Sequence, residues 1–268
     1  MKTIELADKL GKRTLDVPRA YRDLFIMIYL SLRSTFSLSW QSFKPIFYVM
    51  TSQIYFTGHM ALPIITFVAL ATGSIVVMQS LAQLSILGSQ DMMGKILVVT
   101  IIREIGPLLT ALVVIARSGT AVASELANMQ VNKEIEGLRT MSIDPLSYVV
   151  FPRLLGGIIS LVCLAFYFNV IALLGGYLVA TLVKPIQFSF YIEVIARALH
   201  EHDLFLNFFK NAISGLIIFA IACNQGLKVK SSSHEVPIAT TEAVVKSIMT
   251  VMFFNLTLTA IAFYRGLT

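Results

Sequence analysis

One pair of ionisable residues, Arg103 and Glu104, stands inside an otherwise apolar stretch of the sequence. Ionisable side chains at membrane depth are costly, so they usually face a bundle interior or a wet cavity and mark a pathway. A guanidinium in a low-dielectric site can hold a phosphate through two parallel hydrogen bonds. This pair is therefore a candidate site for a phospholipid headgroup.

A structural role for the same pair is the alternative. Adjacent helical residues point in directions about 100° apart, so Arg103 and Glu104 cannot pair well with each other. At least one of them needs a partner on another helix. That partner could be a neighbouring side chain, which would make the pair structural, or a bound ligand.

Other residue types that could do chemistry give weaker signals. His200 and His202 lie close to Glu201 and Asp203, a cluster that could bind a metal but reads more simply as a solvated polar turn. The sequence contains no G-x-x-x-x-G-K-[ST], H-E-x-x-H or G-x-S-x-G motif. We therefore predict no catalytic residue and no metal site, and uphill transport would draw its energy from another chain or an ion gradient.

The composition indicates which elements hold these residues. Of 268 residues, 56% are hydrophobic and 13% charged, whereas soluble domains are about 25% charged. The apolar runs are long enough to cross about 30 Å of hydrocarbon, and inside lipid such runs must be helices. The sequence thus predicts an all-α, polytopic membrane protein. The net charge of +6 suits lipid headgroups, and we expect no nucleic-acid partner.

Five membrane spans are predicted. They cover about residues 60–78, 95–116, 154–183, 208–225 and 245–263. The third is longer than a bilayer requires, so it should tilt, bend at its glycine pairs or emerge into water. We divide the chain into a cytoplasmic N-terminus with an interfacial helix, residues 1–59, and a permease domain, residues 60–268.

The interfacial helix is predicted within residues 19–56. Apolar residues recur there at helical spacing, interrupted by Arg33, Trp40, Lys44 and Pro45. A sixth span is the alternative. Fifteen of the 21 lysine and arginine residues fall in segments that are cytoplasmic if the N-terminus is inside. With five spans, this bias predicts a cytoplasmic N-terminus and a periplasmic C-terminus.

The loop over residues 117–153 is longer than a simple connection needs. Between Ala121 and Met141 its apolar residues fall near helical spacing, with charges on the other faces. Asp144 and Pro145 then predict a turn. The loop could be a surface-bound connector or a coupling helix that docks on a soluble partner.

Dense motifs in this region resemble the MlaE/YrbE family of ABC-transporter permeases. The resemblance lies in the run Arg103-Glu104-Ile105-Gly106-Pro107-Leu108-Leu109-Thr110-Ala111-Leu112, in Arg117-Ser118-Gly119, in Ala123-Ser124-Glu125-Leu126, in Asn128-Met129-Gln130-Val131, in Glu134-Ile135-Glu136-Gly137-Leu138, and in Met141, Asp144-Pro145 and Pro152-Arg153. It is dense over residues 103–153 and looser through 60–265.

The resemblance implies a set of partners. These are a second copy of the chain in a homodimer, a cytoplasmic ABC ATPase that binds ATP and Mg, a periplasmic MCE-domain protein, and a STAS-domain regulator. No cofactor is expected in this chain. The family also has an interfacial N-terminal helix, five spans and a cytoplasmic coupling helix, which agrees with the topology predicted above and favours the coupling interpretation of residues 117–153.

The resemblance also implies site residues. Carried over by position, the phospholipid-binding residues are Val76, Gln83, Leu84 and Leu87 together with Arg103 and Glu104. The expected ATPase-coupling residues are Glu125, Met129, Lys133, Glu134, Glu136, Leu138 and Arg139. Lys133 departs from the family pattern by reversing a charge, so we expect a compensating acid on the ATPase.

These features predict an inner-membrane permease that moves phospholipid between that membrane and a periplasmic MCE-domain carrier, for outer-membrane lipid asymmetry or envelope lipid supply. The alternative from another class is an ion-coupled secondary transporter of an amphiphile that uses Arg103, Glu104 and Lys210 as a charge relay. A membrane scaffold that transports nothing is a third possibility.

Overall fold

The computed structural model describes residues 22–35, 43–87, 90–183, 185, 187–230 and 232–264, and it leaves the side chains of Phe43, residues 83–92 and Val183 undescribed. Within those ranges the chain is helical and contains no strand. After a helix over residues 22–35 come, in order, α2 Phe43–Thr57, the 3₁₀ turn η2 His59–Ala61, α3 Leu62–Leu87, α4 Gln90–Leu97, the π-helical segment η3 Val98–Ile105, α5 Gly106–Val114, the π-helical segment η4 Ile115–Gly119, α6 Thr120–Val131, α7 Glu134–Thr140, the π-helical segment η5 Leu146–Val150, α8 Phe151–Val183, α9 Phe188–Ala198, α10 Glu201–Leu227 and α11 Glu235–Tyr264.

Five helical stretches of the described residues are long and apolar enough to cross a membrane, which confirms the predicted fold class. They are Lys44–Ala82, Met93–Val131, Leu146–Leu182, Glu201–Leu227 and Glu235–Tyr264. Each extends beyond the apolar run from which it was predicted. Hydropathy marks only the part of a helix that needs lipid, whereas the backbone hydrogen bonds continue into the more polar flanks.

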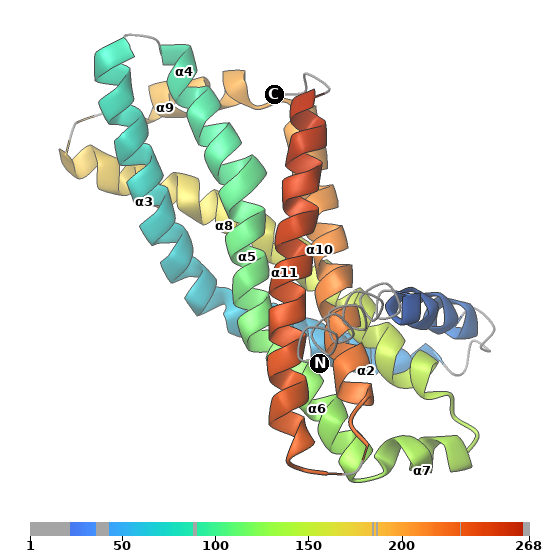
Figure 1. Cartoon of the computed structure of the whole chain (residues 1–268). Coiled ribbons are helices and arrows are strands. Elements are labelled where there is room, and N and C mark those ends of the chain that lie inside the picture. The colour runs from blue at the N-terminus through green and yellow to red at the C-terminus, as the bar shows by residue number, and fades with distance from the viewer. Residues whose placement is uncertain are drawn as a thin grey trace, which may run out of the picture.

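The N-terminal region divides into two helices. Residues 22–35 form a helix too short for about 30 Å of hydrocarbon, and in Figure 1 it lies steeply inclined to α11. Its side chains Phe25 and Tyr29 are exposed, whereas Met27 and Ser31 are buried. Helix α2 instead joins the first span through η2, so part of the segment predicted as interfacial continues directly into a membrane helix.

Helix α8, the long third span, is unbroken. Its glycine pairs therefore do not interrupt it, and in Figure 1 it runs strongly inclined to α11. The glycines serve packing instead. A Cβ added to Gly73 of α3 would lie 2.0 Å from the main-chain oxygen of Ala172, and one added to Gly176 would lie 2.7 Å from the oxygen of Gly73. Small residues of this kind let membrane helices cross with their backbones close together.

The loop predicted over residues 117–153 contains two helices with different surroundings. Helix α6 continues the second span and packs against α10 and α11, with Val122, Ala123 and Leu126 buried. Helix α7 follows after a reversal at Lys133, which has a left-handed φ of 59°. In Figure 1 α7 lies at the lower end and extends away from α6 and α11. Only this second helix projects from the bundle.

Candidate functional site: a buried charge cluster and an exposed short helix

Arg103 and Glu104 both lie on the π-helical segment η3 and have different partners. The guanidinium of Arg103 donates from Nε and Nη2 to Oδ1 of Asp203 on α10, whose carboxylate is completely buried. Glu104 accepts a hydrogen bond from Lys210 Nζ at 2.9 Å and another from Thr259 Oγ1 of α11 at 2.9 Å. The adjacent pair is thus held by two other helices, because the two side chains diverge around η3.

Lys210 is the centre of this cluster. Its side chain is only 2% exposed, and Nζ donates to the main-chain oxygen of Arg103 at 2.8 Å, to Glu104 at 2.9 Å and to Thr259 Oγ1 at 3.0 Å. All three N–H groups of the ammonium therefore have an acceptor, as a buried cation requires.

Pro107 helps to explain the polar face of α10. It stands five residues after Ile102 and four after Arg103 but has no N–H, so it cannot donate to either carbonyl as a π-helical or α-helical residue would. Asn207 Nδ2 donates to the oxygen of Ile102, and Lys210 donates to the next oxygen along the chain. Asp203, Asn207 and Lys210 share one face of α10 at spacings of four and three residues.

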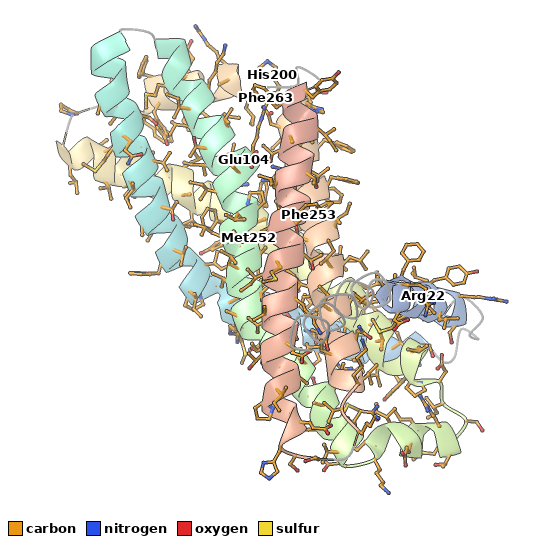
Figure 2. All side chains as sticks on the ribbon, in the orientation of Figure 1. Arg22, Glu104, His200, Met252, Phe253 and Phe263 are labelled. Atoms are coloured by element: carbon orange, nitrogen blue, oxygen red, sulfur yellow. The ribbon has the colours of Figure 1, made fainter. Side chains whose placement is uncertain are left out.

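Two cations and two anions make this cluster, so its formal charge is zero. Its two sides differ in access: the side chain of Asp203 is 0% exposed, whereas that of Glu104 is 39% exposed. Figure 2 shows Glu104 between α5 and α11. The cluster can hold a polar group at this depth of the span through Glu104, while Arg103 is committed to Asp203.

The other predicted lipid-binding residues lie on α3. Val76 is buried in the hydrophobic core at 7% exposure. The side chains of Gln83, Leu84 and Leu87 lie outside the described residues. Of the predicted lipid-binding residues whose side chains are described, Arg103 and Glu104 therefore lie in the charge cluster and contact α10 and α11, whereas Val76 lies in the core.

The predicted coupling residues fall into two groups. Glu125 of α6 pairs with the buried Arg153 at 2.8 Å, and Met129 is half-buried beside it in the same helix. In and beside α7, Lys133, Glu134, Glu136 and Arg139 are exposed, whereas Leu138 packs partly against the core. Of the five exposed charged residues in the predicted set, Glu125 lies on α6 and the other four lie in or beside α7.

Asp203 was the residue that sequence reasoning missed. It was assigned to a solvated polar turn, but it is fully buried, binds Arg103 and caps α10 by accepting from the main-chain N–H of His200 at 3.0 Å. The helical spacing of Asp203, Asn207 and Lys210 among apolar residues such as Leu204 and Phe208 was the available signal. Among the described residues, no group of three or more His, Cys, Asp or Glu could hold a metal ion.

The chain is similar to a known protein family and to several named relatives. The family model described as Permease MlaE matches residues 50–261. A probable ABC transporter permease protein of Rickettsia felis is 28% identical over 262 residues, covering 97% of this chain and 98% of the relative. The intermembrane phospholipid transport system permease protein MlaE of Haemophilus influenzae is 26% identical over 264 residues, 98% of this chain and 99% of that one.

A further relative comes from a plant. The chloroplastic protein TRIGALACTOSYLDIACYLGLYCEROL 1 of Arabidopsis thaliana is 27% identical over 214 residues, covering 80% of this chain and 61% of the relative. Because the family model covers most of the chain, including η3 and α10, this multi-pass membrane protein belongs to the MlaE permease family.

Proposed function

We propose that this chain is the membrane-spanning permease subunit of an ATP-driven transporter that moves phospholipid between the inner membrane and a periplasmic MCE-domain carrier. The family match supports a permease, and the Haemophilus influenzae relative carries phospholipid transport in its name. The observation that carries the proposal is the charge cluster of Arg103, Glu104, Asp203 and Lys210, because a polar group with partial access inside a span marks a substrate path.

The ATPase is a separate chain in this proposal. ATP and Mg bind there, and this chain contributes neither a catalytic residue nor a cofactor. Helix α7 transmits the motion, with Glu136 and Arg139 exposed on it and Lys133 at its start. A helix that projects from a bundle with exposed charges suits docking on a soluble partner.

The working assembly is a homodimer in the inner membrane, with the N-terminus cytoplasmic and the C-terminus periplasmic. Helix α11 exposes Met249, Phe253 and Leu256 by 68%, 69% and 68%, so it has an apolar face for a second copy of the chain or lipid to cover. Figure 2 shows Phe253 and Met252 projecting from it. A STAS-domain regulator and a role in outer-membrane lipid asymmetry or envelope lipid supply belong to the same proposal.

The ion-coupled alternative has one observation in its favour. Arg103, Glu104 and Lys210, which a charge relay would need, do lie in one cluster. In that cluster, however, Arg103 is bound to Asp203, and all three N–H groups of Lys210 already have acceptors. A relay would have to break these bonds at every cycle.

Reconstitution separates the two functions. The full chain is co-expressed with its ATPase, placed in liposomes, and assayed for transfer of a fluorescent phospholipid to an acceptor. The proposal expects transfer that requires ATP and stops when the ATPase Walker lysine is replaced. Transfer by the chain alone, driven by an imposed pH or sodium gradient, would instead establish the ion-coupled function.

A further inference from the structure

The turn that joins α10 to α11 lies at the same end of the molecule as α7. In Figure 1 the end of α6, the beginning of α11 and helix α7 all lie at the lower end. Gln130 Nε2 in α6 donates to the main-chain oxygen of Leu227 at 2.8 Å, so the end of α10 lies beside the end of α6, close to where α7 begins. We call residues 228–230 and 232–238 the α10–α11 turn. None of them belongs to a site predicted above.

The backbone of the α10–α11 turn is fixed against α6. A Cβ added to Gly226, just before the turn, would lie 2.7 Å from the main-chain oxygen of Ala123 and 2.7 Å from Cβ of Leu126. Helices α10 and α6 therefore touch there with no side chain between them. The main-chain N–H of Lys230 donates to Oε2 of Glu235 at 3.2 Å, which joins the two ends of the turn. A surface that is held in place before binding loses less entropy when a partner docks.

Two lysines of the turn are exposed without an ion pair. Lys228 and Lys230 both face water, and Val229 between them is buried at 5% exposure. Neither ammonium forms an ion pair with a described residue. By contrast, Lys246 further along α11 pairs with Glu242 at 2.7 Å. The α10–α11 turn therefore offers two cations to an acidic surface on a partner.

The turn also exposes an apolar side chain beyond the reach of lipid. Ile238, in the first turn of α11, is 59% exposed. Helix α11 has 30 residues, about 45 Å at 1.5 Å per residue, against about 30 Å of hydrocarbon. Counting about 20 residues from Tyr264 brings the hydrocarbon boundary near residue 245, where the exposed pair of Lys246 and Glu242 lies. Ile238 is about 10 Å past that boundary, and a headgroup layer is only about 5–8 Å deep.

We propose that the α10–α11 turn is a second docking surface for the cytoplasmic ATPase, with Lys228 and Lys230 against acidic side chains of that partner and Ile238 in an apolar contact. This inference rests on the proposed function, and it adds to α7 a contact from other spans. A soluble partner that docks on α7 also meets the turn, because Gln130 holds the end of α10 beside the end of α6. A second copy of this chain fits less well, since a symmetric contact would bring the same lysines together.

The second contact changes how motion of the ATPase would reach the charge cluster. Helix α7 is attached to the second span, which carries Arg103 and Glu104. The turn instead joins α10, which carries Lys210, to α11, which carries Thr259. A partner that holds both surfaces can move η3 relative to the two helices whose side chains bind Glu104.

Photo-cross-linking tests the proposal on the full chain in complex with its ATPase. Ile238 is replaced by p-benzoylphenylalanine, which its exposure accommodates, and native membranes that contain the complex are irradiated. Mass spectrometry identifies the adduct. We expect the adduct to be the ATPase, and we expect its yield to fall by about threefold when Lys228→Gln and Lys230→Gln are added, because two charge contacts at the surface are lost.

Two controls match these changes. Lys95→Gln with Lys246→Gln removes the same charge outside the turn, from exposed positions on α4 and α11, and should leave the yield unchanged. The same probe at Ile261, which is 53% exposed within the apolar part of α11, should not label the ATPase. An adduct at position 238 to lipid, to a second copy of the chain or to another protein would overturn the proposal. So would no adduct, or a yield that the two turn substitutions leave unchanged.

The same preparations separate this inference from the function on which it rests. Cross-linking reports contact, whereas transfer of phospholipid reports transport. ATP-driven transfer by a complex that gives no ATPase adduct at position 238 would contradict the second docking surface and support the proposed function. An ATPase adduct in a complex whose transfer proceeds without ATP would support the docking surface and contradict that function.

Discussion

Lys210 Nζ donates to the main-chain oxygen of Arg103 at 2.8 Å, so a carbonyl of the segment η3 accepts its hydrogen bond from a cation of α10. The same ammonium binds the side chain of Glu104. One residue therefore supports both the π-helical backbone and the carboxylate that this backbone presents. The geometry of the candidate substrate site depends on α10 as much as on the span that carries the motif.

Replacing Lys210 by Met should destabilise the chain. The change leaves the Arg103 oxygen and Glu104 without the ammonium, and breaking a buried pair costs about 3–5 kcal/mol. Because Glu104 is 39% exposed, we expect a smaller loss, about 2–3 kcal/mol in the free energy of unfolding. Unfolding in detergent by increasing SDS measures it. Lys246→Met is the control, since it removes a solvent-exposed pair with Glu242 and should cost under about 0.5 kcal/mol.

Asp203→Asn should free Arg103 for an anionic ligand. The amide keeps the volume but removes the buried negative charge that binds the guanidinium. We expect the purified chain to retain more phosphatidylglycerol, by about threefold, which corresponds to about 0.7 kcal/mol. Quantitative lipid mass spectrometry measures this. The double variant Arg103→Ala, Asp203→Asn should return to the original content; if it stays raised, Arg103 is not the group that holds the lipid.

Gly106→Ala should disturb the junction of η3 with α5. The added Cβ would lie 2.2 Å from Asn169 Oδ1 on α8 and 2.7 Å from the main-chain oxygen of Ile101, so the backbone has to move. We expect a loss of about 1–3 kcal/mol and weaker transfer. Gly137→Ala is the matched control: its Cβ meets nothing within 4 Å, and the change in helix α7 should be neutral or stabilise by up to about 1 kcal/mol.

Glu136→Lys should release the ATPase while leaving the permease folded. Glu136 is exposed on α7, so reversing its charge changes the docking surface and little else. Co-purification with a tagged ATPase should fall by about tenfold, with an unchanged midpoint of thermal unfolding. Leu138→Asp is a poorer probe, because Leu138 packs partly on the core. Undiminished co-purification of the Glu136→Lys variant would remove α7 as the contact.

The fold class and the number of spans could be predicted from the sequence. Long apolar runs must be helices in lipid, and that physical requirement holds without knowledge of any neighbour. The same reasoning identified Arg103 and Glu104, because two charges in an apolar run need an explanation wherever they occur. It also predicted that the pair could not satisfy itself.

The partners of the pair, by contrast, depended on tertiary structure. Asp203 is 100 positions from Arg103, and Thr259 is 155 positions from Glu104, so only the packing of α10 and α11 against η3 brings them together. The π-helical turn of η3 was not predicted either, and two of its carbonyls accept from donors on another helix. By itself the sequence determined which residues must avoid lipid. The fold decided which of them meet, because ion pairs across helices form only where two backbones fix the distance between them.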